Sequence, residues 1–199
     1  MLDLNKIFNF YYGWWKNIDK FIFFFILFLF SLGLFFSLVS TSIIASDKLN
    51  TNTYYFFIKH LLFIILGVFI LITFSAIDQK KLFQISKYLF FIFFIFLALV
   101  PFIGVEAKGS TRWIDLPGIP RFQPIEILKP FLIIMISTAF TLNSQQNIYF
   151  KYLFSFLIIL PIILFLISQP DIGQTILIVL TWFSLIFVSG INLLFFFVF

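Results

Sequence analysis

The chain has 199 residues, of which 62% are hydrophobic and 11% are charged, and it carries 35 phenylalanines. This composition is typical of a protein whose solvent is lipid, and it excludes an ordinary soluble domain. The absence of cysteine excludes disulfides and thiolate metal sites, and the single histidine, His60, cannot complete a zinc site or a catalytic triad. The net charge of +5 is modest and spread along the chain. We therefore expect no nucleic acid partner, whereas anionic membrane lipid is a suitable one.

Residues 1–20 are interpreted as a cytoplasmic, interfacial amino terminus. Between Lys6 and Lys20 lies an aromatic cluster that comprises Tyr11, Tyr12, Trp14 and Trp15. Tyr and Trp gather at the level of the lipid headgroups, because one end of each ring system is apolar and the other is polar. We therefore expect a short interfacial helix before the first span.

Six charge-free runs follow, each close to or above the roughly 20 residues with which a helix crosses a bilayer. They are 21–46, 61–77, 88–105, 130–150, 152–170 and 172–199. The runs are continuously apolar, whereas the strands of a membrane barrel alternate, so helices are favoured. The sequence thus predicts an all-α, polytopic membrane protein with about six transmembrane helices. Because the last run ends in "INLLFFFVF" without a polar tail, we also expect the chain to be part of a longer protein.

The distribution of cations is consistent with a cytoplasmic amino terminus under one assumption. That placement puts seven Lys or Arg residues inside and six outside, which is almost no bias. Four of the outside cations lie within residues 106–129. If these four serve a function, the remaining seven against two agree with the excess of positive charge in cytoplasmic loops.

Charges gather in the segment "GSTRWIDLPGIPRFQPIEILKP", residues 109–130. Pro117, Gly118 and Pro120 exclude a helix in its first half. Residues 106–124 are therefore predicted to form a structured external loop between spans three and four.

The start of span four carries an acid and a base. Pro124 suits the first turn of a helix, where its missing N–H breaks no hydrogen bond, and Glu126 is favoured there by the helix dipole. Lys129 lies three residues later on the same helical face. One interpretation is a neutral structural ion pair at the membrane boundary.

The alternative interpretation is a cationic anion site. Arg112, Arg121 and Lys129, with Lys108 nearby, have the chemistry to bind a phosphate or diphosphate, since Arg offers a planar fork of donors and Lys a point charge. In this interpretation Glu126 orients the lysine.

A second polar segment, "SQPDIGQT" at residues 168–175, lies between spans five and six. The number of spans places it on the same external face as the loop of residues 106–124. Its one charge, Asp171, is either the N-cap of the last helix or a contact to the cationic segment or to the substrate.

Taken together, "KGSTRWIDL", "RFQPIEILKP", "QPDIGQT" and "VSGI" resemble the SEDS family of shape, elongation, division and sporulation proteins. The stretches "VEAKGSTRWI" and "WWKNIDK" are more similar to its division branch, FtsW, than to RodA. One departure is Ile125, where the family usually has Ser in a "QPSE" segment. Gln123, Pro124, Glu126 and Lys129 of that segment are retained.

The resemblance implies that residues 1–199 form the amino-terminal part of a single membrane domain of about ten helices. It implies a peptidoglycan glycosyltransferase (a hexosyltransferase) of the bacterial inner membrane, which polymerises lipid II at the division septum. The implied partners are a penicillin-binding-class transpeptidase and other division proteins. The aspartate assigned to catalysis in the family lies in a later external loop that this chain does not include, so the general base is unassigned.

The resemblance also implies roles for particular residues. Arg112 and Lys129 match the family's cationic residues, which would stabilise the leaving diphosphate. With them we group four further substrate-binding candidates, which are Arg121, Gln123, Glu126 and Asp171. We expect no resident cofactor or metal in this chain, although a divalent cation could assist the missing base.

Two other functions compete with the polymerase. A transporter or flippase of the same lipid would use the same cations to carry the diphosphate across the membrane. A non-catalytic scaffold that recruits division proteins, or an inactive remnant, is the third hypothesis, which is motivated by the end of the chain within an apolar run at Phe199.

Overall fold

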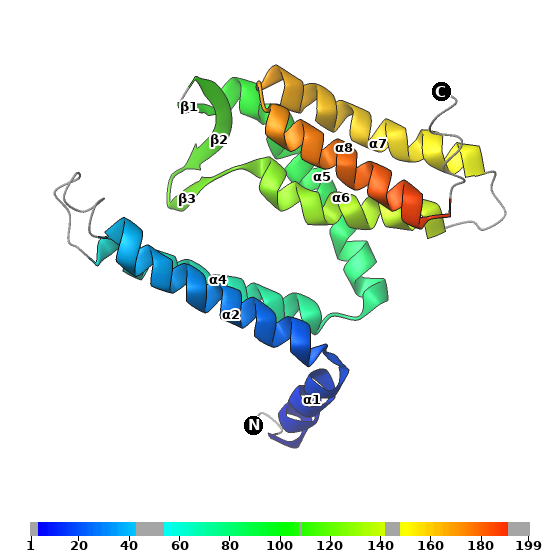
Figure 1. Cartoon of the computed structure of the whole chain (residues 1–199). Helices are drawn as coiled ribbons and strands as arrows, with labels where there is room; N and C mark the ends of the chain where they lie inside the picture. Colours follow the sequence, from blue (N-terminus) through cyan, green and yellow to red (C-terminus); the bar gives the residue numbers. More distant parts are fainter. Residues whose placement is uncertain (1–3, 43–53, 108, 142–147, 191–199) are drawn as a thin grey trace. The chain divides into compact units, whose positions relative to one another are not determined.

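The structure is a computed structural model that describes residues 4–42, 54–107, 109–141 and 148–190 (Figure 1). It divides into two compact units, residues 1–78 and 79–199. Each unit is built of helices, and the second also carries a small sheet.

The first unit contains an amino-terminal helix and two apolar helices. Helix α1 (Leu4–Asn17) is the short helix expected around the aromatic cluster. Helix α2 (Lys20–Phe36) begins after Asp19, whose side chain accepts a hydrogen bond of 3.1 Å from the amide of Ile22. A π-helix, η1 (Ser37–Ser42), continues α2, and α4 (Tyr55–Ser75) runs back beside it (Figure 1).

The α2 and α4 helices contact each other at two positions, where a ring on one helix packs against a glycine on the other. A methyl group at Gly33 would lie 3.8 Å from the ring of His60, and one at Gly67 would lie 3.7 Å from the ring of Phe30. Small residues allow membrane helices to approach closely, where dispersion forces are the main attraction. The helices are thus packed by complementary shape, although most of their surface is exposed in the chain alone.

The second unit is a bundle of four helices, α5 (Gln79–Ile103), α6 (Pro124–Thr141), α7 (Ile148–Ser168) and α8 (Ile172–Val188) (Figure 1). Its core is aliphatic, and its most deeply buried side chains include Leu97, Val100, Leu128, Ile136, Ile159, Ile162, Leu166 and Ile186. Two hydrogen bonds join polar groups from different parts of this bundle. The Trp182 indole N–H donates to the Ser155 hydroxyl at 3.0 Å, and the Gln169 amide donates to the Leu97 carbonyl at 3.4 Å.

The segment 106–124, predicted as a structured loop between two spans, contains most of a three-stranded antiparallel sheet among its described residues. Strand β1 (Val105–Ala107) pairs with β2 (Ser110–Leu116), which pairs with β3 (Ile119–Phe122). Pro117 and Gly118, with φ of +79° at the glycine, form the turn between β2 and β3, as in a type II turn. The prolines do exclude a helix, but the β-forming run before Pro117 pairs with its neighbours.

The sheet is attached to the helical bundle through its middle strand. Ile114 of β2 is 1% exposed, and β2 contacts both α5 and α6. The ring of Phe122 on β3 meets that of Phe96 on α5 edge to face, with centroids 6.0 Å apart. These apolar contacts hold the strands against the end of the bundle where α5 stops and α6 begins.

The helices confirm the predicted polytopic helical fold and correct several boundaries. Five of the described helices are long and apolar enough to cross a membrane, and α8, at 17 residues, is slightly shorter. The second span was predicted to start at 61, but α4 starts at Tyr55, because the charge-free criterion excluded the helical turn that carries Lys59 and His60. The run 130–150 extends past the end of α6 at Thr141 and into α7, which begins at Ile148, while the ends of the runs 21–46 and 172–199 lie outside the described residues.

The first prediction concerns the sidedness of α5. Because the chain has no cysteine, the single variants Lys81→Cys, near the start of α5, and Pro117→Cys, in the β2–β3 turn, can be labelled selectively. Both positions are exposed. We expect a membrane-impermeant maleimide to label Pro117→Cys in intact spheroplasts and Lys81→Cys only after lysis, since α5 separates the two positions. Labelling of both from the same side would contradict a transmembrane α5, and the cysteine-free parent gives the background.

Candidate functional site

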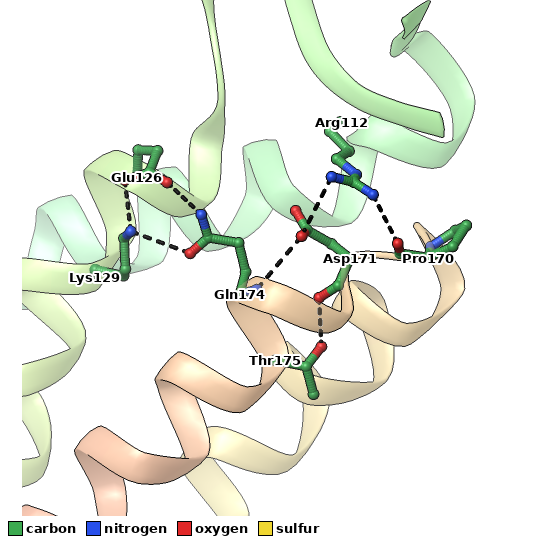
Figure 2. Close-up of polar contacts among 7 residues, drawn as sticks. All are labelled: Arg112, Glu126, Lys129, Pro170, Asp171, Gln174 and Thr175. Carbon is green, nitrogen blue, oxygen red and sulfur yellow. Dashed lines mark hydrogen bonds and ion pairs between the residues drawn. The ribbon is translucent and has the colours of Figure 1, made fainter. Parts of the chain in front are cut away.

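The candidate site lies where the amino-terminal ends of α6 and α8 meet strand β2 (Figure 2). Glu126 lies in the first turn of α6 and Gln174 in the first turn of α8. Both helices also present backbone N–H groups that have no partner within the helix. The positive end of each helix dipole therefore points to this region. The sequence segments that meet are the two polar segments identified above.

Arg112 reaches from β2 to the start of α8 (Figure 2). One terminal nitrogen, Nη1, lies 3.4 Å from Oδ1 of Asp171, and Nη2 donates to the carbonyl of Pro170 at 2.7 Å. Asp171 is 5% exposed and serves as the N-cap of α8, where Oδ1 accepts from the amide of Gln174 at 3.4 Å. The two interpretations of Asp171, N-cap and contact to the cationic segment, are both correct.

Lys129, Glu126 and Gln174 form the other half of the site (Figure 2). The Lys129 ammonium lies 2.5 Å from Oε2 of Glu126, so the predicted ion pair is present. The same ammonium donates to Oε1 of Gln174 at 3.1 Å, while Nε2 of Gln174 donates to Oε1 of Glu126 at 2.5 Å. The side-chain amide of Gln174 on α8 thus forms one hydrogen bond with each of the two charged groups on α6.

Gln174 is the residue that the sequence analysis missed. Its position three residues after the N-cap Asp171 fits a capping box, in which its side chain would turn back to the cap residue. In the structure the side chain instead turns across to α6. The capping pattern would have singled Gln174 out, but not its contacts, because Glu126 and Lys129 are more than forty residues away in sequence.

The other predicted site residues are placed differently. Arg121 on β3 binds Asp115 on β2, through contacts of 2.7 and 3.2 Å, and both side chains are about half exposed. Gln123 is half-buried, and its backbone carbonyl accepts a hydrogen bond of 3.2 Å from the backbone amide of Glu126. Lys108 lies outside the described residues. Ile125, the departure from the family pattern, is 2% exposed and contributes to the core.

The four charged residues that meet, Arg112, Asp171, Glu126 and Lys129, are balanced in formal charge. Each cation nevertheless keeps unused donors, since Arg has five N–H groups and Lys has three. Nε of Arg112 is buried without a partner among the described residues. The arrangement therefore holds two cations in fixed positions with capacity for a further acceptor.

Comparison with known proteins places these features in a family. A family model described as "Cell cycle protein", which covers FtsW, RodA and SpoVE, matches residues 19–199. The chain belongs to this family. The match agrees with the predicted SEDS resemblance, and it includes every element that builds the site.

The curated relatives carry the FtsW name, in agreement with the predicted branch. A probable peptidoglycan glycosyltransferase FtsW of Nitrosomonas europaea is 40% identical over 50% of this chain and 26% of that protein. The protein of the same name in Taylorella equigenitalis is 34% identical over 77% of this chain and 43% of its own length. The chain therefore matches less than half of these relatives.

Solved structures show the same fold. Thermus thermophilus RodA, a rod shape determining protein, gives a TM-score of 0.62 at 23% identity, over 80% of this chain and 54% of that one. A chain from a peptidoglycan synthase complex gives 0.61 at 24% identity, over 80% and 47% of the two chains. Together with its apolar helices, the family assignment identifies this chain as a multi-pass membrane protein.

The second prediction tests the two roles of Asp171. The Asp171→Ala variant loses the helix cap and the partner of Arg112, so we expect it to lower the free energy of unfolding by about 1–3 kcal/mol. Asp171→Asn keeps a capping oxygen and should lose less. The matched control is Asp115→Ala, which breaks a half-exposed ion pair and should cost less than about 1 kcal/mol. Unfolding in detergent is followed by tryptophan fluorescence, and equal stability of wild type and Asp171→Ala would refute the assignment.

The third prediction concerns Gln174 as the link between α8 and α6. A double-mutant cycle that combines Gln174→Leu with Lys129→Met should give a coupling free energy of about 0.5–1.5 kcal/mol, because the two side chains share a hydrogen bond. The control cycle pairs Gln174→Leu with Arg121→Met, whose effects should add within about 0.5 kcal/mol. Additivity in both cycles would show that the bridge contributes nothing to stability.

Proposed function

We propose that this chain is part of a peptidoglycan glycosyltransferase that polymerises lipid II during cell division, and that its polar site holds the substrate diphosphate. The observation that carries the proposal is the meeting of Arg112 and Lys129 beside two helix amino termini, each cation fixed by an acid. The names of the relatives, peptidoglycan glycosyltransferases, supply the class of reaction.

The chemistry of the transfer explains why cations are needed. When a sugar hydroxyl attacks the glycosidic carbon, the bond to the lipid diphosphate breaks and negative charge grows on the departing phosphate oxygen. Fixed donors stabilise that charge most effectively when they are oriented before the reaction. Arg112 would offer its planar fork and Lys129 a point charge, and the two helix dipoles add to the positive potential.

The acids of the site act on the cations and not on the sugar in this proposal. Asp171 is buried and already engaged as a helix cap and as the partner of Arg112. Glu126 is engaged by Lys129 and Gln174. Both acids are paired with cations, so we propose that the general base, and a divalent cation that could assist it, belong to the region of the family's later external loop.

The proposal narrows the predicted substrate-binding set. Arg112 and Lys129 would contact the diphosphate, while Glu126, Gln174 and Asp171 would position them. Arg121 is engaged with Asp115 on the exposed sheet, so we assign it no direct contact.

The location and partners are also part of the proposal. One structural neighbour belongs to a complex described as coordinating polymerisation and crosslinking. By analogy we propose that this protein works with a penicillin-binding-class transpeptidase at the division septum of the inner membrane.

The fourth prediction tests the diphosphate site directly. In protein expressed from the complete gene and purified in detergent, Arg112→Ala and Lys129→Ala should each lower polymer formation from lipid II by about 100-fold or more, because each removes a donor to the leaving group. Arg121→Ala removes the same charge from the exposed ion pair and should retain wild-type activity. Glycan products are resolved on gels.

Other outcomes of this assay favour the competing functions. Wild-type rates in both cation variants would overturn the proposed site. If the protein forms no polymer in detergent but moves lipid II between the leaflets of vesicles after reconstitution, the result would instead support the transporter. Absence of both polymer formation and lipid II transport would support the scaffold hypothesis.

A further inference from the structure

A second polar feature of the chain lies wholly within the first unit and has no part in the proposed diphosphate site. A groove of about 720 Å³ opens where α2 passes into η1 and where α4 begins. This volume is within the range of about 300–1,000 Å³ that is typical of small-molecule sites. The groove is open along one side, as a site filled from the surrounding lipid would be.

The polar wall of the groove is formed by Lys59, His60 and Ser37. Lys59 is exposed, and the ring of His60 faces α2 at the position of Gly33, where the absence of a side chain leaves the space open. Ser37 is 8% exposed and is the first residue of the π-helix. Such irregular helical turns are frequent at functional sites.

The remaining wall of the groove is aromatic, with Phe36, Phe56 and Phe63 among its lining residues. Phe36 and Phe63 are exposed in the chain alone. Apolar rings next to a cation and a hydroxyl form a surface with a charged end and an apolar end. That pairing matches a lipid, whose phosphate and acyl chains need the same two environments.

Among the described residues, the charge at this end of the helices favours an anion. In the described part of the first unit the carboxylates are Asp19, which caps the start of α2, and Asp78, which follows the end of α4. Both lie at the opposite ends of these helices from Lys59 and His60. The groove is also at the ends of two membrane-spanning helices, and therefore at the depth of the lipid headgroups.

From these observations we infer that the groove binds an anionic phospholipid, with its phosphate at Lys59, His60 and Ser37 and an acyl chain along the phenylalanines. The lysine supplies a charge, and the imidazole and hydroxyl supply hydrogen-bond donors. A lysine and two hydrogen-bond donors beside apolar rings have the chemistry to hold an anionic headgroup and its acyl chain. The bound lipid would fill the groove between α2 and η1 on one side and α4 on the other.

The fifth prediction tests this site by native mass spectrometry of the full chain, titrated with phosphatidylglycerol in detergent. The Lys59→Gln variant should weaken binding about five-fold, since one cation near the membrane surface contributes about that factor. Lys87→Gln, an exposed lysine on α5, is the charge-matched control and should bind like wild type. Gly33→Leu should also weaken binding, because the new side chain enters the groove without changing the charge.

Two further lipids separate the sources of the phosphate. Phosphatidylcholine, which has no net charge, should bind more weakly than phosphatidylglycerol, and undecaprenyl phosphate should not displace it. Equal binding by wild type, Lys59→Gln and Gly33→Leu would overturn the site, as would equal binding of the two phospholipids. Preferential binding of undecaprenyl phosphate would overturn the assignment to a phospholipid. Lys59 is exposed, so Lys59→Gln keeps the test valid if Gly33→Leu fails to fold.

Discussion

The buried carboxylate of Asp171 is the constraint on which the second unit depends. Removing an ionised carboxylate from water costs several kcal/mol, so its oxygens must be satisfied by donors. In this chain the donors come from two directions, the backbone of α8 and the guanidinium of Arg112. One residue therefore starts the last described helix and attaches β2 to it. Loss of the carboxylate would remove the cap of α8 and its ion pair with β2 together, and would leave the apolar contacts of Ile114 and Phe122 to hold the sheet.

The position of the polar site follows from the same physics applied to the whole bundle. Within lipid every backbone group must be paired, so helices cross and their unpaired ends gather polar partners at the boundaries. Because α7 follows α6 in the chain and runs back antiparallel to it, α6 and α8 begin on the same side. Their amino termini, with the acids and amides that these ends favour, are brought together although more than forty residues separate them.

Local rules predicted the features that depend on one helix. The first-turn proline Pro124, the pair of Glu126 with Lys129 and the capping Asp171 all follow from sequence spacing, and the structure has them. Pro117 and Pro120 were correctly taken to exclude a helix, but the pairing of the strands within the predicted structured loop was not foreseen, because it depends on which segments lie side by side. The role of Gln174 and the pairing of Arg121 with Asp115 depend on which segments meet in space, and spacing along the chain contains no such information.

The two cations of the site differ in how firmly they are held. Asp171 has a side chain that is 6% exposed and cannot leave Arg112 without also uncapping α8. Glu126 has a side chain that is 47% exposed and could turn into water, leaving Lys129 to Gln174 and to an incoming anion. The separation of Glu126 from Lys129 costs little free energy, because water then replaces the contacts of the Glu126 carboxylate. In the proposed diphosphate site, Arg112 would therefore be the fixed anchor, and Lys129 would be the cation that exchanges Glu126 for an oxygen of the diphosphate.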